Sequence, residues 1–313
     1  MAVAIALSQR ARPSSAPNPN VGCLLVKDGQ VIARGWTQTG GRPHAEAMAL
    51  DAASNAARGA TAYVTLEPCA HASPRGPACS DTLIAAGVAR VVVAAQDPDP
   101  RTDGAGIARL KAAGIEVVTG VLAAEARGAM APWWARQTRA RPFVTLKLAT
   151  SLDGCIARAD GASRWITGER ARAHGHLERA RHQAILVGRG TFDADAPKLD
   201  VRLPGLTDRS PKKLLLTRGA APQGWTAVAS PDAIEGVDSV LVEGGAGAAS
   251  AFLAADRVDR LLLYRAPILI GGGKPALGDI GLTDLAEAHR WRLADSRLLG
   301  SDRLDVYERA REG

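Results

Sequence analysis

The sequence predicts a soluble α/β protein with two domains. Its 313 residues are about twice the length of an ordinary domain. Short apolar runs alternate with segments of helical periodicity, which is typical of strands joined by helices in a parallel or mixed sheet. One arginine-rich segment that ends in proline, RQTRARP at 136–142, interrupts this alternation. We therefore predict a boundary there, with domains over residues 1–140 and 141–313.

Local patterns predict the elements of the first domain. Asp28-Gly29 joins two apolar runs, and both residue types tolerate the positive φ of a two-residue hairpin turn. Alanine-rich spacing from His44 to about Ala57 predicts a helix, and the apolar run that ends at Pro68 predicts a strand. Further helices are expected at 2–11, 80–86, 103–113 and 122–136, and further strands at 88–95 and 115–120.

The second domain repeats the alternation of strands and helices. The polar stretch 191–211 has no periodicity, so we expect a loop there. Strands are expected at 143–149, 184–188, 212–217, 237–243 and 260–267, and helices at 169–182 and 246–255.

Composition and charge narrow the classes of function. The net charge of +7 is shared evenly between the two halves, whereas nucleic-acid binders concentrate basic residues in a patch. Aromatic residues make up only 4%, which leaves little for base stacking. No apolar run reaches the ~18–20 residues of a membrane helix, and no basic segment precedes the apolar N-terminus as in a signal peptide. We expect a cytoplasmic protein with neither nucleic-acid nor membrane partners.

One constellation in the first domain predicts a zinc deaminase. His44, Cys69 and Cys79 supply one imidazole and two thiolates, which leaves a fourth zinc position open for water. Glu46 follows His44 in the order H-x-E and is expected to move the proton from water to the substrate. His71 is expected to face the substrate or support the site rather than bind the metal. Cys23 and Cys155 lie in apolar stretches, and we expect both to be small buried residues.

Beyond these residues, the chain resembles the bifunctional deaminase/reductase of riboflavin biosynthesis. The likeness covers nearly the whole chain and lies in PNPNVGCLLVKDG (17–29), PHAEAMAL (43–50), ATAYVTLEPCAHASPRGPACSDTLIAAGVARVVVAAQDPDP (60–100) and LKLATSLDG (146–154). The loop 72–78 is one residue longer than the usual form, and Ala196 replaces an acidic residue usual before proline. The resemblance implies a cytidine-deaminase-like α/β/α domain with a mixed sheet, followed by a dihydrofolate-reductase-like α/β domain.

The resemblance also implies a reaction and its cofactors. The family deaminates 2,5-diamino-6-(5-phosphoribosylamino)pyrimidin-4(3H)-one with one zinc ion. It then reduces the ribosyl group with NADPH, which gives 5-amino-6-(5-phosphoribitylamino)uracil. By this resemblance Asn18 and Asn20 contact the pyrimidine; a turn around Pro19 is the alternative interpretation. The expected partners are the small phosphoribosylaminopyrimidine and further copies of the chain, as a dimer or tetramer.

Residue patterns alone say less about the second domain. VEGGAG at 242–247 lies between a strand and a helix, where backbone amides hold phosphates, but it lacks the third glycine of a dinucleotide fingerprint. A tight structural turn is the alternative. The resemblance assigns NADPH contacts to Ala149, Trp165, Thr191, Asp195, Thr217, Gly245, Ala246, Gly247, Ala248, Ala249, Ser250 and Ala251. It assigns substrate contacts to Ser163, Arg179, Leu199, Arg202 and Glu243.

Three basic side chains carry the expected reductase chemistry. Arg179 and Arg202 are expected to hold the ribose phosphate, because a guanidinium binds phosphate in a planar, bidentate manner. Lys147 is the expected proton donor to the sugar, since its strand runs into the SLDG turn at 151–154. For all three, a structural ion pair is the alternative. The rival function for the whole chain is a nucleoside or nucleic-acid zinc deaminase with a non-catalytic ligand-binding C-terminal domain.

Overall fold

Two units make up the chain in the computed structural model, Met1–Ala140 and Arg141–Gly313. The structure describes residues 1–71 and 73–311. Ala72, at the start of the longer loop 72–78, lies outside the described residues. Each unit is built on a mixed sheet with helices on both faces, which confirms the predicted α/β class.

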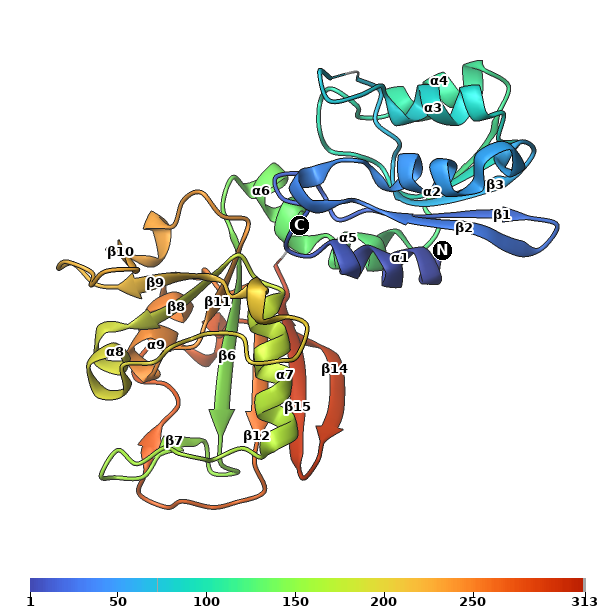
Figure 1. The fold of residues 1–313 in the computed structure, drawn as a ribbon. Helices are drawn as coiled ribbons and strands as arrows, with labels where there is room; N and C mark the ends of the chain where they lie inside the picture. The colour runs from blue at the N-terminus through green and yellow to red at the C-terminus, as the bar shows by residue number, and fades with distance from the viewer. Residues whose placement is uncertain (72, 312–313) are drawn as a thin grey trace. The chain divides into compact units, whose positions relative to one another are not determined.

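The first unit contains a five-stranded sheet of order β2-β1-β3-β4-β5. Only the pairs that involve β1 are antiparallel, and β3, β4 and β5 run parallel. Figure 1 shows α1 and α5 on one face and α2, α3 and α4 on the other. The bounds are α1 (Ala2–Ser8), β1 (Gly22–Lys27), β2 (Gln30–Trp36), α2 (Ala45–Ala53), β3 (Thr61–Leu66), α3 (Cys79–Ala86), β4 (Arg90–Ala95), α4 (Ala105–Ala112), β5 (Glu116–Thr119), α5 (Ala123–Ala129) and α6 (Ala131–Arg139).

The β1–β2 hairpin has the predicted turn. Lys27 pairs with Gln30, and the two residues between them, Asp28 and Gly29, have φ angles of 51° and 74°. These positive values are those of a two-residue turn whose twist matches the strands it joins.

The predicted helix over 122–136 is two helices in the structure. α5 ends at Ala129 and α6 begins at Ala131, with Pro132 in its first turn. Proline lacks the N–H that would continue one helix into the next. The predicted break at 136–142 also begins later, because α6 continues to Arg139.

The second unit contains an eight-stranded sheet of order β10-β9-β8-β11-β6-β12-β15-β14. Its strands run parallel from β10 to β12, and β15 and β14 are antiparallel. A small sheet of β7 and β13 lies beside it. The bounds are β6 (Phe143–Thr150), β7 (Cys155–Ala157), α7 (Glu169–Ala180), β8 (Ala184–Gly188), α8 (Arg189–Asp195), β9 (Lys212–Leu216), β10 (Thr226–Val228), β11 (Ser239–Val242), α9 (Ala246–Ala254), β12 (Arg260–Arg265), β13 (Lys274–Pro275), β14 (Trp291–Leu299) and β15 (Asp302–Arg309).

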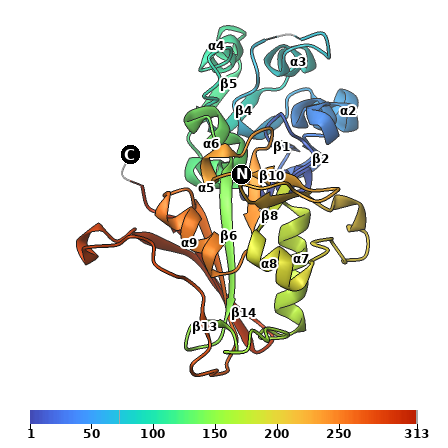
Figure 2. The same cartoon turned by 90° about the vertical axis from the view of Figure 1, so that its left-hand side faces the viewer.

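Helices cover both faces of this sheet. Figure 2 shows α9 on one side of β6, and α7 and α8 on the other. On the α9 face, Phe252 packs with Leu146 and Leu148 in the main core. On the α7 face, Tyr264 packs with Leu262 and Leu304.

Several elements of the second unit differ from the sequence prediction. The short strands β7, β10 and β13 were not predicted. Residues 191–195, expected to be in a loop, form the last five of the seven residues of α8. The predicted loop therefore begins only at Ala196. The hairpin of β14 and β15 was not predicted at all, and its turn is formed at Gly300, which has a φ of 74°.

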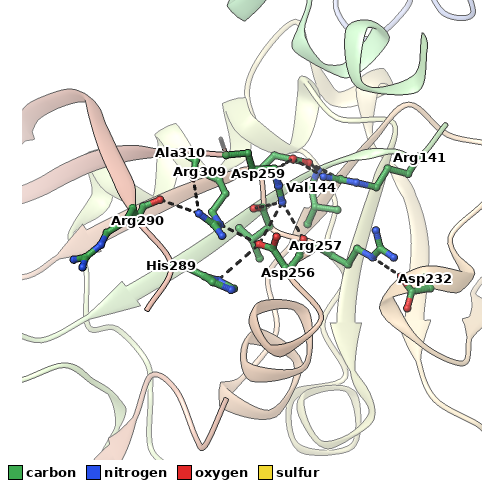
Figure 3. A network of polar contacts seen from close by, with 12 residues as sticks. Arg141, Val144, Asp232, Asp256, Arg257, Asp259, His289, Arg290, Arg309 and Ala310 are labelled. Carbon is green, nitrogen blue, oxygen red and sulfur yellow. Dashed lines mark hydrogen bonds and ion pairs between the residues drawn. The ribbon is translucent and has the colours of Figure 1, made fainter. Parts of the chain in front are cut away.

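A buried carboxylate joins the two ends of the second unit (Figure 3). Asp259 accepts two hydrogen bonds of 2.8 Å from the guanidinium of Arg141 and one of 3.0 Å from the Val144 amide. Arg311, near the C-terminus, donates to the same carboxylate at 2.6 Å. Asp256 accepts a further bond of 3.0 Å from Arg309. The first and last described residues of the unit are thus fixed at one point.

Candidate active sites

Three ligand-type side chains meet at the ends of three elements of the first unit. His44 directly precedes α2, Cys79 is the first residue of α3, and Cys69 lies three residues beyond β3. Their ligand atoms all lie within 4.8 Å of one another. His44 Nδ1 is 3.2 Å from Cys79 Sγ and 3.7 Å from Cys69 Sγ. The predicted metal ligands therefore converge, and this donor set fits zinc.

The two cysteines are held by backbone contacts between their segments. The Cys79 amide donates to Cys69 Sγ at 3.3 Å, and Ser80 donates to the Cys69 carbonyl from both its amide and its hydroxyl. The hydrogen bond from the Cys79 side chain, more than that from its amide, lowers the pKa of Cys69 to about 4. The Cys69 sulfur is therefore prepared as a thiolate, the form that binds metal.

Glu46 lines the same cavity as His44 and Cys69. It is in the first turn of α2, and it is only 3% exposed. Burial raises the pKa of Glu46, so its carboxyl group is suited to hold a proton as well as to release one.

A cavity of about 380 Å³ opens onto these residues. Asn18 lines it, with Nδ2 3.0 Å from His44 Nε2 and 2.9 Å from the Gly41 carbonyl oxygen. His71 also lines it, with Nδ1 3.4 Å from Thr102 Oγ1. His71 thus faces the cavity and is outside the ligand trio.

Asn20 has a different environment from Asn18. Its buried side chain donates to the carbonyls of Ala129 at 3.1 Å and Ser8 at 3.4 Å. Among the described residues that line the cavity, Asn18 is present and Asn20 is not. The structure therefore does not bring Asn20 to the expected pyrimidine site.

Sequence reasoning missed several residues of this cavity. Asp97 is buried in its wall, and burial raises the pKa of Asp97 to about 7. Arg42 and Arg75 line the cavity without a carboxylate partner among the described residues, whereas Arg101 is paired with Asp99. The signal for Asp97 was the DPDP run directly after a buried strand, where side chains of neighbouring strand ends gather.

In the second unit, three predicted site residues form one ion-pair network. Arg179 on α7 binds Glu243 through two hydrogen bonds of 2.7 and 2.9 Å. Lys147 Nζ, from β6, lies 3.9 Å from the same carboxylate and 5.8 Å from the centre of the Tyr264 ring. Burial opposes the ionisation of Glu243, but the hydrogen bonds from Arg179 and the charge of Lys147 outweigh it and lower its pKa to about 2. Both Lys147 and Arg179 therefore form ion pairs with Glu243, as the alternative interpretation of these residues expects.

Arg202 differs from Arg179 in its exposure. Its side chain is 61% exposed, and its guanidinium lies 3.4 Å from the Asp200 carboxylate. Arg179 donates to the Asp200 carbonyl at 3.0 Å, so both arginines reach the same segment. Only Arg202 is largely open to a ligand. Leu199 is buried in a core cluster, and Ser163 lies half-buried in the segment before α7.

The glycine-rich loop packs tightly where α9 begins. Thr191 Oγ1 accepts a hydrogen bond of 2.9 Å from the Gly245 amide. A Cβ atom on Gly244 would lie 2.5 Å from the Ala248 side chain, so glycine is required for this approach. A Cβ atom on Gly247 would meet nothing within 4 Å, so its backbone is open to a ligand. The first amides of α9 have no partner within the helix and fit a phosphate of NADPH.

The other expected NADPH contacts have mixed environments. Ala246 begins α9, Ala248 and Ala249 are in the main core, and Ala251 is half-buried. Ser250 Oγ accepts a hydrogen bond of 2.8 Å from the Gly278 amide. Trp165 is 66% exposed and stacks with Arg172 at 4.9 Å. Asp195 lies 3.8 Å from Arg164, Thr217 Oγ1 accepts a bond from the Gly219 amide, and Ala149 packs near Tyr264.

Comparisons with known protein families divide the chain in the same order. The family model described as "Cytidine and deoxycytidylate deaminase zinc-binding region" matches residues 1–95. The model described as "RibD C-terminal domain" matches residues 142–230 and 233–304. The chain is 38% identical to "Riboflavin biosynthesis protein RibD" of Escherichia coli, and the match covers 96% of each chain. It is 33% identical to the protein of that name from Aquifex aeolicus, over 99% of this chain and 97% of the other.

Solved structures give the same result. The structure of Acinetobacter baumannii RibD superposes with a TM-score of 0.86 at 35% identity, over 99% of this chain and 98% of the other. A deaminase/reductase from Thermotoga maritima superposes with a TM-score of 0.87 at 33% identity, over 99% and 97%. Its description gives both activities, diaminohydroxyphosphoribosylaminopyrimidine deaminase and 5-amino-6-(5-phosphoribosylamino)uracil reductase.

Proposed function

Because this chain belongs to the RibD family of bifunctional riboflavin-biosynthesis enzymes, we propose that Met1–Ala140 carries the deaminase and Arg141–Gly313 the reductase. The chain is a zinc-dependent deaminase and an NADPH-dependent reductase. The main support for assigning deamination to the first unit is the convergence of His44, Cys69 and Cys79 beside the buried Glu46.

The first reaction is the hydrolytic removal of an amino group from 2,5-diamino-6-(5-phosphoribosylamino)pyrimidin-4(3H)-one. His44, Cys69 and Cys79 would hold the zinc ion, which would supply the acidity that makes water a nucleophile near neutral pH. Glu46 takes one proton from the attacking water and delivers it to the ring nitrogen. It then moves the proton of the newly formed hydroxyl group to the amino group, which leaves as ammonia while the C=O bond forms. Asn18 and His71 face the cavity and are placed to orient the pyrimidine.

The ribose phosphate of this substrate needs a cationic site. Arg42 and Arg75 line the cavity, and both lack a carboxylate partner among the described residues. A guanidinium binds phosphate in a planar, bidentate manner, so these two are suited to the role. We expect Arg75→Ala to raise KM for the phosphorylated substrate and to leave KM for its dephosphorylated form unchanged.

The second reaction reduces the ribosyl group to ribityl, which gives 5-amino-6-(5-phosphoribitylamino)uracil. NADPH supplies the hydride, and the amides at the start of α9 are placed to hold its pyrophosphate. Lys147 donates a proton or hydrogen bond to the sugar, and Glu243 fixes its position at 3.9 Å. Arg202 holds the phosphate of the substrate, because Arg179 is already bound to Glu243.

The chain acts on a small molecule, and we propose that it does so in the cytoplasm without nucleic acid. None of the helices in the described part of the chain combines the length and apolar character that a membrane crossing requires. The even spread of charge and the few aromatic residues support the absence of a nucleic-acid partner.

We further propose that two copies of the chain pair along β14. This strand is the edge of the eight-stranded sheet, and Leu293 and Leu298 on it are 50% and 74% exposed. An exposed apolar edge strand is a template for pairing. Antiparallel pairing centred on Ser296 places Asp295 opposite Arg297 of the second copy. Light scattering should show a dimer or larger oligomer, and Leu298→Asp should reduce its mass to that of one chain.

Product masses test the proposed reactions most directly. The purified chain is incubated with the diaminopyrimidine phosphoriboside, with and without NADPH. We expect the deaminated pyrimidine alone without NADPH, and the ribityl product when NADPH is present. Deamination without any reduction would leave the second unit without its assigned chemistry.

Limited trypsin treatment tests the division into units. Arg139 is the exposed last residue of α6, and the following Arg141 precedes proline, where trypsin does not cut. We therefore expect the first cut after Arg139 and two folded pieces. Early cutting within 60–120 would contradict the boundary.

A further inference from the structure

Glu67 is a buried carboxylate to which the reactions above give no role. It is 2% exposed, directly follows β3, and lies two residues before Cys69. Its two oxygens accept hydrogen bonds from four backbone amides of a single segment. The donors are Asp97 at 3.2 Å, Gly104 at 3.0 Å, Gly106 at 2.9 Å and Ile107 at 3.1 Å.

These contacts join the strand end to the start of α4. Gly106 and Ile107 are in the first turn of that helix, whose amides have no partner within the helix and favour a negative charge. A Cβ atom on Gly106 would lie 2.0 Å from the Pro68 carbonyl oxygen, so α4 begins directly against the segment 67–69. The segments 67–69 and 97–107 therefore form one packed block.

The segment held in this way forms one wall of the deaminase cavity. Asp97, Asp99 and Arg101 all line it, as do Glu67 itself, Cys69 and Glu46. Thr102, in the same segment, contacts His71 at 3.4 Å. Glu67 thus connects the segment of a metal ligand, Cys69, to a segment whose side chains line the cavity.

We propose that Glu67 is a positioning residue for deamination, because it fixes the wall 97–102 relative to Cys69. The inference rests on the proposed assignment of deamination to the first unit. A carboxylate suits the position, since both of its oxygens accept and neither donates. Glutamine has the same shape, but its amide group would point two N–H donors at backbone N–H donors. That variant therefore releases part of the wall without opening a cavity.

The test compares Glu67→Gln with Glu125→Gln, the same change at an exposed glutamate of the same unit. We expect Glu67→Gln to keep one zinc per chain and full NADPH-dependent reduction of deaminated substrate. Amide hydrogen exchange over 97–107 should become faster. The kcat/KM of deamination should fall by about 10²-fold, mostly through KM, as for a site displaced by about 1 Å. Glu67→Asp keeps two acceptor oxygens and should recover part of the loss.

Two outcomes would overturn the role of Glu67. Exchange and KM at the level of the Glu125→Gln control would show that the wall does not depend on it. Loss of zinc in step with activity would show that it supports the metal site instead. Zinc content and amide hydrogen exchange are measured independently of turnover. An inactive wild-type chain would therefore refute the proposed function, and the exchange over 97–107 would still decide the role of Glu67.

Discussion

The two units present their functional groups in opposite states. In the deaminase unit, three ligand atoms converge within 4.8 Å beside a cavity of about 380 Å³. In the reductase unit, Arg179 and Glu243 already bind each other, and the Gly245 amide is bonded to Thr191. A metal site can be identified in a sequence from the types of its ligand residues. In a site built of ion pairs, the role of each charged residue depends on its partner, which only the fold determines. This difference explains why residue roles transfer more directly to the first unit.

The largest expected effect tests the independence of the two units. Cys69→Ser should lose zinc and all measurable deamination, because serine is a poor zinc ligand at this position. Reduction of deaminated substrate, followed by NADPH absorbance, should continue at the wild-type rate. Cys23→Ala, at a buried cysteine outside the ligand trio, should keep its zinc. A coupled loss of both activities would contradict the comparison.

Glu46→Gln should leave the metal in place and still stop the first reaction. The amide cannot take the proton from water, so deamination should fall by about 10²–10⁴-fold. Metal analysis and product mass measure the two quantities separately. A rate near that of the wild type would exclude Glu46 as the proton carrier.

Lys147→Ala tests whether a paired charge also acts in the chemistry. We expect kcat for reduction to fall by about 10²-fold, with KM nearly unchanged, because a proton donor acts in the transition state. Lys212→Ala, at an exposed lysine that begins β9, is the control. A change in KM alone would leave Lys147 with only its structural contact to Glu243.

The two arginines at Asp200 separate ligand binding from structural pairing. Arg202→Ala should raise KM for the deaminated substrate about tenfold at constant kcat, since one charge-assisted bond to phosphate is lost. Arg179→Ala should instead destabilise the unit, because it leaves the buried Glu243 carboxylate without its partner. Thermal unfolding and steady-state kinetics distinguish the two. Equal effects of both variants would favour the original expectation that the arginines act together.

The smallest expected effect concerns pH. Because the pKa of Glu243 is lowered to about 2 in the folded unit, its contribution to stability is present above the usual glutamate pKa of ~4.3. That contribution is lost as the pH falls through about 4 toward 2. Between pH 5 and 3, the unfolding midpoint of the wild type should fall by about 5 °C more than that of Glu243→Gln. Parallel curves would contradict the ion pair.

Local signals predicted much of the fold. The hairpin at Asp28-Gly29 and the helix after His44 depend on turn chemistry and spacing within a few residues, and both were confirmed. The break at Met130 was missed because helical spacing continues on both sides of it. Residues 191–195 of α8 were missed because they are polar and continue into the polar stretch that follows. β14 was missed because it is an exposed edge strand, where no buried face imposes an alternating pattern.

The candidate sites show the same limit. Cys69, Cys79 and His44 were found because their chemical types and order specify a metal. Asn20 was wrongly expected at the pyrimidine site. Its hydrogen-bond partners, the carbonyls of Ser8 and Ala129, lie on other elements of the fold and cannot be inferred from the residues around it. Glu67 and Asp97 were missed for the same reason, since their contacts join segments about 30 residues apart.

The shared carboxylate of Asp259 has a consequence for engineering the reductase. Arg141 and Arg311 both reach it, so the start and the end of this unit lie within two side-chain lengths of each other. A short glycine linker is long enough to join them, and new termini fit at the exposed turn around Gly300. Such a circular permutant keeps the strand order of the eight-stranded sheet unchanged. It also moves the chain ends to the β14–β15 turn, where an attached protein would be carried on the edge hairpin.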